Sequence, residues 1–440
     1  MLKKFNKILV ANRGEIAIRI FRACSELGIK SVGIYSKEDK YGLFRTKADE
    51  SYLIGEGKGP IDAYLDMDGI IDLAKRKKVD AIHPGYGFLA ENAEFARKCE
   101  ENGITFIGPS SKVMNMMGDK INSKKIAKEV NVQTIPGVEK AIRSTEEAKE
   151  VANKIGYPVM IKASSGGGGK GMRIVRKEEE LFSNFDMASS EALAAFSNSD
   201  LYMEKFIENP RHIEVQVFGD KHSNAIHLGD RDCSMQRRNQ KVIEESLSPY
   251  LSDEERQKLH KIAVDIVKGV GYIGAGTIEF IVDKDKNFYF IEMNTRIQVE
   301  HPVTEMVTNL DLIKLQISIA NGDKIPFKQE DISINGHAIE FRINAENPYK
   351  NFMPSPGKIT QYLAPGGFGV RIESACYTNY TIPPYYDSMV AKLIVHEPTR
   401  EESIMTGIRA LSEYLVLGID TTIPFHLRLL NNHIFRSGEF

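Results

Sequence analysis

The order of apolar patterns in the first 115 residues restricts the fold more than any other feature of the sequence. Apolar runs at 7–11 and 30–36 enclose a stretch in which Ile16 and Ile20 recur at helical spacing. The same strand–helix–strand pattern continues at 80–88, 91–102 and 105–109. Strands that alternate with helices predict a parallel, doubly wound α/β domain over residues 1–115. Only one glycine, Gly14, follows the first strand, where a dinucleotide fold needs three, so the NAD interpretation is weak.

The pattern changes twice after this domain. A small unit at about 135–205 holds two apolar strands on either side of a glycine run. Beyond it, alternating strands joined by short polar turns predict antiparallel hairpins. These strands are expected at 212–220, 224–238, 276–283 and 287–294. The tail combines short strands with a final helical stretch, so we expect a second domain at 116–335 and a mixed α+β domain at 336–440.

The composition is that of a multidomain globular protein. A chain of 440 residues is too long for one typical core. Its 58 Lys and Arg nearly balance 60 Asp and Glu, which argues against a general nucleic-acid or membrane-surface binder. The four cysteines form no C-x-x-C pair, and the start lacks the apolar core of a signal peptide. We therefore expect reduced thiols and a cytoplasmic protein.

The run GGGGK at 166–170 is a candidate phosphate site. Consecutive glycines leave backbone N–H groups unshielded, and such groups can surround phosphate oxygens at close range. A P-loop would need Ser or Thr after the lysine, whereas Lys170 precedes Gly171. The simpler alternative is a flexible hairpin tip. We expect a flap that closes over nucleotide phosphates, with Lys162 on the preceding strand as a phosphate partner.

The hairpin that ends in EMN carries the sharpest chemical signal. If its turn centres between Asp285 and Lys286, Glu279 lies directly opposite Glu292. Like charges in that arrangement destabilise a sheet unless a hard divalent cation neutralises them. Asn294 follows on the same face as Glu292 and can supply a third oxygen. This pattern predicts a Mg²⁺ site, and the alternative is a solvated hairpin in a different register.

Four polar residues occur at steps of two from the last residue of the hairpin onwards, namely Asn294, Arg296, Gln298 and Glu300. In an extended segment all four project to the same side. A guanidinium, an amide and a carboxylate would there bind and deprotonate a small oxyanion, with arginine for recognition and glutamate as base. The alternative is a polar, solvent-facing strand edge.

Several other segments are weaker candidates. A solvated loop is the default for the basic segment 231–241, although contact with a polyphosphate or bicarbonate is consistent with its composition. Single histidines such as His212 are usually structural. The edge at 204–207 could hold an adenine through its backbone. Arg342, two residues beyond Glu340 on a strand, has a surface ion pair as its default interpretation.

The chain resembles the biotin carboxylase family, within the biotin-dependent branch of the ATP-grasp superfamily. The likeness covers essentially all 440 residues. Its motifs are ANRGEIAIRI, HPGYGFLAEN, KASSGGGGKGMR, EKFIENPRHIEVQ, GDRDCSMQRRNQK, EMNTRIQVEHPVTE and PPYYDSM. The resemblance implies an ATP-grasp fold with a mobile lid at about 135–205. It also implies ATP- and Mg²⁺- or Mn²⁺-dependent carboxylation of biotin by bicarbonate through carboxyphosphate.

The resemblance also implies roles for individual residues. Nucleotide contacts are implied for Lys120, Lys162, Gly168, Gly169, Glu204, Lys205, Phe206, Ile207, His212, Gln236 and Asn239. Metal ligands are implied at Glu279, Glu292 and Asn294. Bicarbonate contacts are implied for Lys241, Arg296, Gln298 and Val299, with Glu300 as the base. Arg342 would steady the biotin enolate, and Tyr86 lies near the place that receives biotin. Asn239 departs from the histidine of many relatives.

The assembly is the least determined part of the resemblance. The chain has no A-M-K-M biotinylation motif and ends at GEF, a little earlier than such proteins usually do. We expect a slightly short form, a separate biotin carboxyl carrier protein, separate carboxyltransferase subunits and a homodimer. Segment 287–430 resembles the subunit of acetyl-CoA carboxylase, which serves fatty acid synthesis. Segment 44–66 resembles pyruvate carboxylases, and a propionyl-CoA or other acyl-CoA carboxylase and a non-catalytic ATP-binding regulator are further alternatives.

Overall fold

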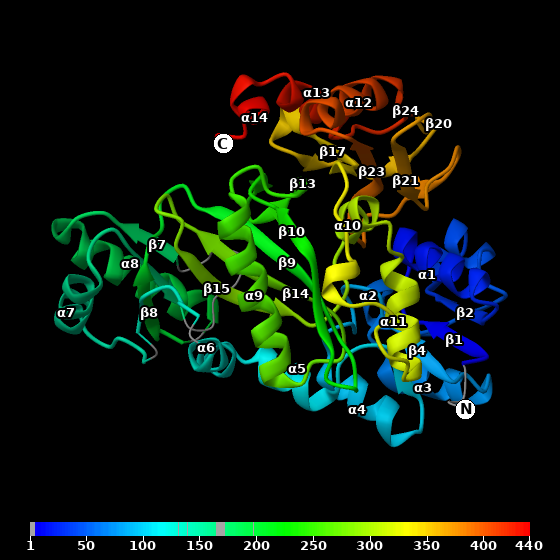
Figure 1. Ribbon diagram of the computed structural model, residues 1–440, viewed down its shortest axis with the longest axis horizontal. Helices are drawn as coiled ribbons and strands as arrows, with labels where there is room; N and C mark the ends of the chain where they lie inside the picture. Colours follow the sequence, from blue (N-terminus) through cyan, green and yellow to red (C-terminus); the bar gives the residue numbers. More distant parts are fainter. Residues whose placement is uncertain (1–4, 131, 139, 164–171, 197) are drawn as a thin grey trace. The chain divides into compact units, whose positions relative to one another are not determined.

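The structure is a computed structural model that describes residues 5–130, 132–138, 140–163, 172–196 and 198–440 (Figure 1). The chain packs as two units. Unit 1 comprises Met1–Ile126, His212–Glu279 and Glu292–Phe440, and unit 2 comprises Ala127–Arg211 and Phe280–Ile291. Within the described ranges, no helix combines the length and the apolar character that a membrane span requires.

Unit 1 begins with a five-stranded parallel sheet in the order β3-β2-β1-β4-β5, drawn in blue and cyan in Figure 1. Its strands are β1 (Lys7–Val10), β2 (Lys30–Tyr35), β3 (Glu50–Leu53), β4 (Ala81–His83) and β5 (Thr105–Phe106). The accompanying helices are α1 (Gly14–Glu26), α2 (Pro60–Tyr64), α3 (Met67–Arg76), α4 (Ala93–Glu101) and α5 (Ser111–Gly118), and α6 (Lys120–Glu129) follows. The predicted doubly wound α/β architecture is confirmed.

The apolar run of β1 shows why this sheet is covered on both faces. Ile8 and Val10 belong to one core, which also contains Ile16 and Ile20 of α1. Leu9, between them, belongs to a second core built with α3 and α4. Successive residues of a strand point to opposite faces, so a strand that is apolar at every position must be buried on both sides.

The second sheet of the chain has eight strands in the order β15-β14-β9-β10-β13-β16-β23-β21. Their bounds are β9 (Arg211–Gly219), β10 (Ala225–Asp232), β13 (Ile243–Ser246), β14 (Gly274–Val282), β15 (Phe288–Asn294), β16 (His337–Asn344), β21 (Val370–Ser374) and β23 (Met389–Glu397). Neighbouring strands from β9 through β10, β13, β16 and β23 to β21 pair antiparallel, as the alternating pattern indicates. Because β13 pairs with β16, this sheet continues across the predicted domain boundary at 335. The three-domain division remains a prediction.

Helices and small hairpins complete unit 1. The helices are α9 (Asp253–Val270), α10 (His301–Thr308), α11 (Leu312–Asn321), α12 (Arg400–Glu413), α13 (Ile423–Leu430) and α14 (His433–Ser437). The short strands are β11 (Gln236–Arg237), β12 (Gln240–Lys241), β17 (Glu346–Asn347), β18 (Met353–Pro354), β19 (Gly357–Lys358), β20 (Gln361–Leu363), β22 (Thr381–Ile382) and β24 (Leu415–Leu417). Ser252 and Glu255 form a capping box at the start of α9, and Gly271 ends that helix in the left-handed region.

Unit 2 contains a three-stranded antiparallel sheet in the order β7-β6-β8. Its elements are α7 (Thr145–Ile155), β6 (Val159–Ala163), β7 (Met172–Val175), α8 (Leu181–Phe196) and β8 (Leu201–Lys205). Val159, Ile161 and Ala163 pack on α7 and α8, so Lys162, which lies between Ile161 and Ala163, projects from the other face. The predicted glycine run at 166–170 lies outside the described residues, and the strands that flank it pair antiparallel.

Candidate active site

Glu300 lies between two cations in unit 1. Its carboxylate is 2% exposed. Lys241 Nζ lies 2.7 Å from Glu300 Oε1, and Arg342 Nη2 lies 3.1 Å from Glu300 Oε2. Burial alone would raise the pKa of the Glu300 carboxyl, but Lys241 and Arg342 lower that pKa well below its usual range. Glu300 is therefore an ionised carboxylate, and a general base must be in this deprotonated form to accept a proton.

Glu279 is a second buried carboxylate and accepts several donors. Asn294 Nδ2 donates to its Oε1 at 2.8 Å, and Gln298 Nε2 donates to the same atom at 2.9 Å. Lys241 Nζ lies 3.1 Å from Oε1, so the same ammonium links Glu279 to Glu300. His212 Nε2 lies 2.8 Å from the other oxygen. These donors explain why the pKa of Glu279 falls below its usual range although burial raises it.

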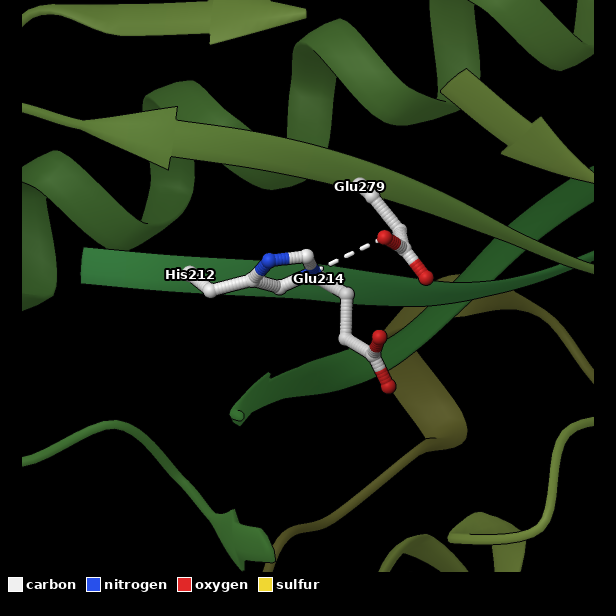
Figure 2. Close-up of side chains that lie close together, drawn as sticks. All are labelled: His212, Glu214 and Glu279. Carbon is white, nitrogen blue, oxygen red and sulfur yellow. Dashed lines mark ion pairs between the residues drawn. The ribbon is translucent and has the colours of Figure 1, made fainter. Parts of the chain in front are cut away.

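Figure 2 shows the side chains of His212 and Glu214 from β9 beside Glu279. Their ligand-type atoms all lie within 4.8 Å of one another, a spacing at which one cation could contact all three. Burial lowers the pKa of the His212 imidazole, whereas its hydrogen bond to Glu279 raises it, and the net change is a rise. His212 was expected to contact the nucleotide, and in this structure its imidazole contacts the carboxylate of Glu279.

The turn of the predicted metal hairpin differs from the expectation. The N–H of Asp283 donates to the carbonyl of Asn287 at 3.2 Å, and Lys286 has a left-handed φ of 62°. The loop therefore contains three residues centred on Asp285, and the register predicted from a centre between Asp285 and Lys286 is wrong at the turn. Lys286, the third residue of this loop, has a positive φ and forms a bulge, which the alternation of apolar and polar residues in the sequence does not reveal.

The two predicted carboxylate ligands have different surroundings. Glu279 is 6% exposed, whereas Glu292 is an exposed residue of β15. Asn294, two residues further along the strand, is 7% exposed and contacts Glu279. Carboxylate and amide oxygens suit a hard cation such as Mg²⁺, so the donor chemistry of these three residues fits the ion.

The segment from 294 to 300 is not extended throughout. Strand β15 ends at Asn294, and α10 begins at His301 after a turn. The extended conformation assumed for this segment therefore does not continue as a strand beyond Asn294, and the chain enters α10 at His301, with Pro302 in the first turn of that helix. The polar side chains nevertheless meet: Arg296 Nη2 donates to Asn294 Oδ1 at 3.0 Å, and Gln298 reaches Glu279.

A cavity of about 520 Å³ opens beside these residues within unit 1. Its lining includes Tyr86, Arg296, Val299 and Arg342. The hydroxyl of Tyr86 donates to Glu15, and Val299 presents its carbonyl to the ammonium of Lys392 at 2.9 Å. The cavity thus brings together four residues that were predicted separately for bicarbonate and for biotin.

The basic segment at 231–241 divides into a buried and an exposed part. Gln236 pairs with Lys241 in a hairpin and donates from Nε2 to the carbonyl of Cys233 at 2.9 Å. Arg238 and Asn239 form the two-residue turn, with φ of 48° and 64°. Asparagine tolerates this left-handed conformation better than most residues, which gives a structural reason for Asn239. Asn239 itself is exposed.

The predicted nucleotide residues of unit 2 lie on and after its central strands. Lys162 on β6 and Glu204 on β8 form an ion pair, with side chains 36% and 18% exposed. Lys205 Nζ donates to the carbonyls of Gly156 and Tyr157 at 3.0 and 2.8 Å. Phe206 and Ile207 follow the end of β8, at the strand-to-loop edge that was expected. Gly168 and Gly169 fall outside the described residues, and so does the side chain of Lys120.

Several residues of the site were missed by sequence reasoning. They are Glu214, Arg231, Glu244 and Lys392, all of which are buried. Glu214 lies two residues after His212 on one strand, and this period of two could have indicated a shared face. The default interpretation was a solvated loop for the segment that begins at Arg231 and a surface ion pair for Arg342. Arg231 is fully buried, and Arg342 donates to buried Glu244 at 2.6 Å, so neither default interpretation holds.

Known protein families match the chain over nearly its whole length. Residues 4–114 match the biotin carboxylase N-terminal domain, and residues 340–440 match the biotin carboxylase C-terminal domain. Residues 119–328 match the ATP binding domain of the carbamoyl-phosphate synthase L chain.

Similar proteins serve different carboxylases. Biotin carboxylase 1 of Bacillus subtilis is 56% identical over 99% of this chain and 96% of its own length. A pyruvate carboxylase subunit of Methanothermobacter thermautotrophicus is 54% identical over 99% of this chain and 88% of its own length. A crystal structure of the biotin carboxylase domain dimer of Hydrogenobacter thermophilus 2-oxoglutarate carboxylase, in complex with MgADP, ADP and bicarbonate, superposes with a TM-score of 0.93. The two sequences are 53% identical, and the match covers 100% of this chain and 96% of the crystallised chain.

Proposed function

This chain belongs to the biotin carboxylase family, and we propose that it carboxylates biotin on a separate carrier protein for an acetyl-CoA carboxylase. The observation that carries the proposal is Glu300, an ionised buried carboxylate held between Lys241 and Arg342. Glu279 and Asn294 contact each other beside it, and their oxygens suit a metal that binds nucleotide phosphates. A base, anion-binding cations and a candidate metal site within one unit are the parts that phosphoryl transfer to a small anion requires.

The proposed chemistry is the one that the family resemblance implies, and the charges of these residues suit its steps. Glu300 takes the bicarbonate proton, and a bicarbonate oxygen attacks the γ-phosphorus of ATP, so that ADP leaves and carboxyphosphate forms. Carboxyphosphate breaks its C–O bond to give CO₂ and phosphate. Phosphate removes the proton from the biotin ureido nitrogen, which then bonds to the carbon of CO₂. Arg342 would stabilise the negative charge on the ureido oxygen.

The basicity of Glu300 depends on where its two cations point. In the present arrangement Lys241 and Arg342 favour the carboxylate and make it a weak base. When these cations turn towards the substrate anions, the pKa of Glu300 rises, and the carboxylate gains the driving force to accept a proton. Substrate anions and Glu300 thus compete for the same two cations.

Glu279, Glu292 and Asn294 would hold the Mg²⁺ ion that we propose as the partner of ATP. When bound, the ion neutralises charge on the nucleotide phosphates and orients them. Lys162, near Glu204 in unit 2, would bind phosphate oxygens as a point charge. ATP and bicarbonate are the substrates, and the biotin carrier, the carboxyltransferase subunits, the homodimer and the cytoplasmic location belong to the same proposal.

Bicarbonate-dependent release of ADP, measured with free biotin present, tests the activity. We expect wild-type turnover to require bicarbonate, and Glu300→Gln to lower it by about a hundredfold or more, the range for loss of a general base. Lys261→Gln is the matched control, because Lys261 is exposed on α9 and pairs with Asp265 of the same helix. ATP turnover that ignores bicarbonate, or persists in Glu300→Gln, would contradict the activity.

A second candidate assembly is the ATP-dependent subunit of a two-chain pyruvate carboxylase. The identities to the two relatives described above differ by little, so overall similarity does not separate the acceptors. The two assemblies are separated by supplying biotinylated carrier proteins from each kind of carboxylase. We expect the acetyl-CoA carboxylase carrier to give the higher kcat/KM, whereas a preference for the pyruvate carboxylase carrier would favour the second candidate.

A further inference from the structure

Arg231 is a fully buried cation next to the residues of this site. It lies on β10 and is 0% exposed. Each of its five N–H groups has an acceptor, namely Glu214 Oε1 at 2.6 Å, Gln216 Oε1 at 2.8 Å, Thr304 Oγ1 at 3.0 Å, Thr277 Oγ1 at 3.1 Å and Gln298 Oε1 at 2.7 Å. A guanidinium with every donor satisfied has one defined orientation, so its partners are oriented as well.

The contact with Gln298 determines which end of that amide faces the site. A guanidinium has no acceptor, so only the amide oxygen of Gln298 can bind Arg231. The amide nitrogen must then point the other way, and it donates to Glu279 Oε1 at 2.9 Å. An amide nitrogen carries two N–H groups, and among the described residues Glu279 is the one acceptor of this nitrogen, which leaves its second N–H for an anion. Without Arg231 the amide could rotate and present its oxygen, which repels an anion.

We propose that Arg231 is a positioning residue that presents the N–H group of Gln298 to bicarbonate. The inference rests on the proposed function, because it assigns bicarbonate to the site that contains Gln298. Arg231 has no exposed surface, so it acts through Gln298 and does not touch the substrate. The same guanidinium also binds Glu214, whose other oxygen lies 2.6 Å from Lys241 Nζ. Arg231 therefore connects a neutral donor and a cation of the same anion site.

Arg231→Lys is the first test. An ammonium can still pair with Glu214, but it cannot donate in five fixed directions. We expect the KM for bicarbonate to rise about tenfold or more, as for loss of a hydrogen bond from a charged donor. The KM for MgATP should change less than about twofold. An equal rise in both KM values, or an unchanged bicarbonate KM, would overturn the proposal.

Thr304→Val is the matched control. Thr304 accepts from Nη1 of Arg231, whereas Gln298 is held by Nη2. The variant leaves one buried N–H without an acceptor and should lower the thermal unfolding midpoint, while the bicarbonate KM stays unchanged. If Thr304→Val raised the bicarbonate KM as much as Arg231→Lys, the role of Arg231 would be structural and not one of orienting Gln298.

A double-mutant cycle separates Gln298 from the Lys241 route. In a Gln298→Ala background the amide is absent, so Arg231→Lys should add little to the bicarbonate KM. Fully additive effects would mean that Arg231 acts through Glu214 and Lys241, and would overturn the inference. Bicarbonate-dependent ADP release by the wild-type chain is established first, because its absence would contradict the proposed function itself.

A crystal structure of the wild-type chain with bicarbonate keeps the inference testable if Arg231→Lys does not fold. We expect Gln298 Nε2 within hydrogen-bond distance of a bicarbonate oxygen, with Gln298 Oε1 still on Arg231. An amide turned away from Arg231, or bicarbonate bound without contact to Gln298, would overturn the inference.

Discussion

Units 1 and 2 carry charge in different ways. In unit 1 the cations Lys241, Arg342 and Arg231 lie largely buried among carboxylates, and each binds two or more acceptors. In unit 2 the corresponding pair is Lys162 with Glu204, and the lysine side chain is 36% exposed. A buried network is costly to interrupt, whereas a partly exposed pair contributes little to stability. The two units should therefore respond differently to loss of one cation.

The largest effect is expected from Lys241→Met in unit 1. The variant leaves three carboxylates, those of Glu214, Glu279 and Glu300, without their shared ammonium. We expect about 3–5 kcal/mol of lost stability together with nearly complete loss of bicarbonate-dependent turnover. Hydrogen exchange of unit 1 and ADP release measure the two losses. A variant that keeps wild-type protection in unit 1 would remove the contrast between the units.

Lys162→Met is the matching change in unit 2. Because its ion pair is partly exposed, the cost in stability should stay below about 1 kcal/mol. The KM for ATP should rise about tenfold or more if the ammonium binds a phosphate. Lys149→Met provides the control, since Lys149 pairs with Glu178 in the same unit and both side chains are 45% exposed. An ATP KM that rises equally in the control would contradict a specific role for Lys162.

Glu292→Ala sharpens the contrast within the proposed metal site. Glu292 is exposed, so the free energy of unfolding should change by less than about 0.5 kcal/mol. The Mg²⁺ concentration needed for half-maximal ATP turnover should rise about tenfold. Titration of Mg²⁺ at fixed ATP provides the measurement. Equal losses of stability and activity would speak against a metal role.

The last contrast between the two units concerns acid. All ten histidines of the chain lie in unit 1. Burial lowers the pKa of His83 and of His227 to about 3, and that of His426 to about 4. These imidazoles stay neutral in the folded state but bind protons near pH 6.5 in the unfolded state. Their contribution to stability is therefore complete above about pH 6.5 and is lost as the pH falls towards the folded pKa values.

We expect unit 1 to lose about 1 kcal/mol for each of these three histidines at one pH unit below 6.5, with no such loss in unit 2. Hydrogen exchange of the intact chain at two pH values resolves the units, after correction for the intrinsic exchange rate. His227→Gln should reduce the pH dependence in unit 1. Equal pH dependence in both units would show that these histidines are not its cause.

The sequence predicted the architecture well where local patterns are strong. The apolar run at 7–11 was predicted as a strand of a doubly wound domain, and in the structure it is buried on both faces, since Ile8 and Leu9 belong to different cores. The predicted centre of the hairpin turn was wrong, because one residue with positive φ, Lys286, changes the register of the strands without changing the apolar pattern. The roles of the site residues stay predictions, and the structure adds contacts between several of them, such as those that join Lys241 to Glu279 and Glu300.

The buried charges were the part that sequence could not reveal. Arg231 lies in a segment with several other basic residues, and its burial results from strands that are distant in sequence. Glu340 on β16 and Glu244 on β13 are paired across the two strands, and both are fully buried. Glutamate is exposed in most proteins, so the sequence alone favours an exposed position for both. Burial raises the pKa of both carboxyls, that of Glu244 to about 7. Such groups are recognised only when the partners that surround them are known.

Transfer of oxygen from bicarbonate to phosphate tests the central claim most directly. If a bicarbonate oxygen attacks the γ-phosphorus of ATP, that oxygen remains on phosphorus when carboxyphosphate breaks down. With bicarbonate labelled with ¹⁸O and biotin present, each phosphate released should carry one labelled oxygen, as mass spectrometry can show. Phosphate without label would mean that water attacks ATP, and would contradict the activation of bicarbonate by this chain.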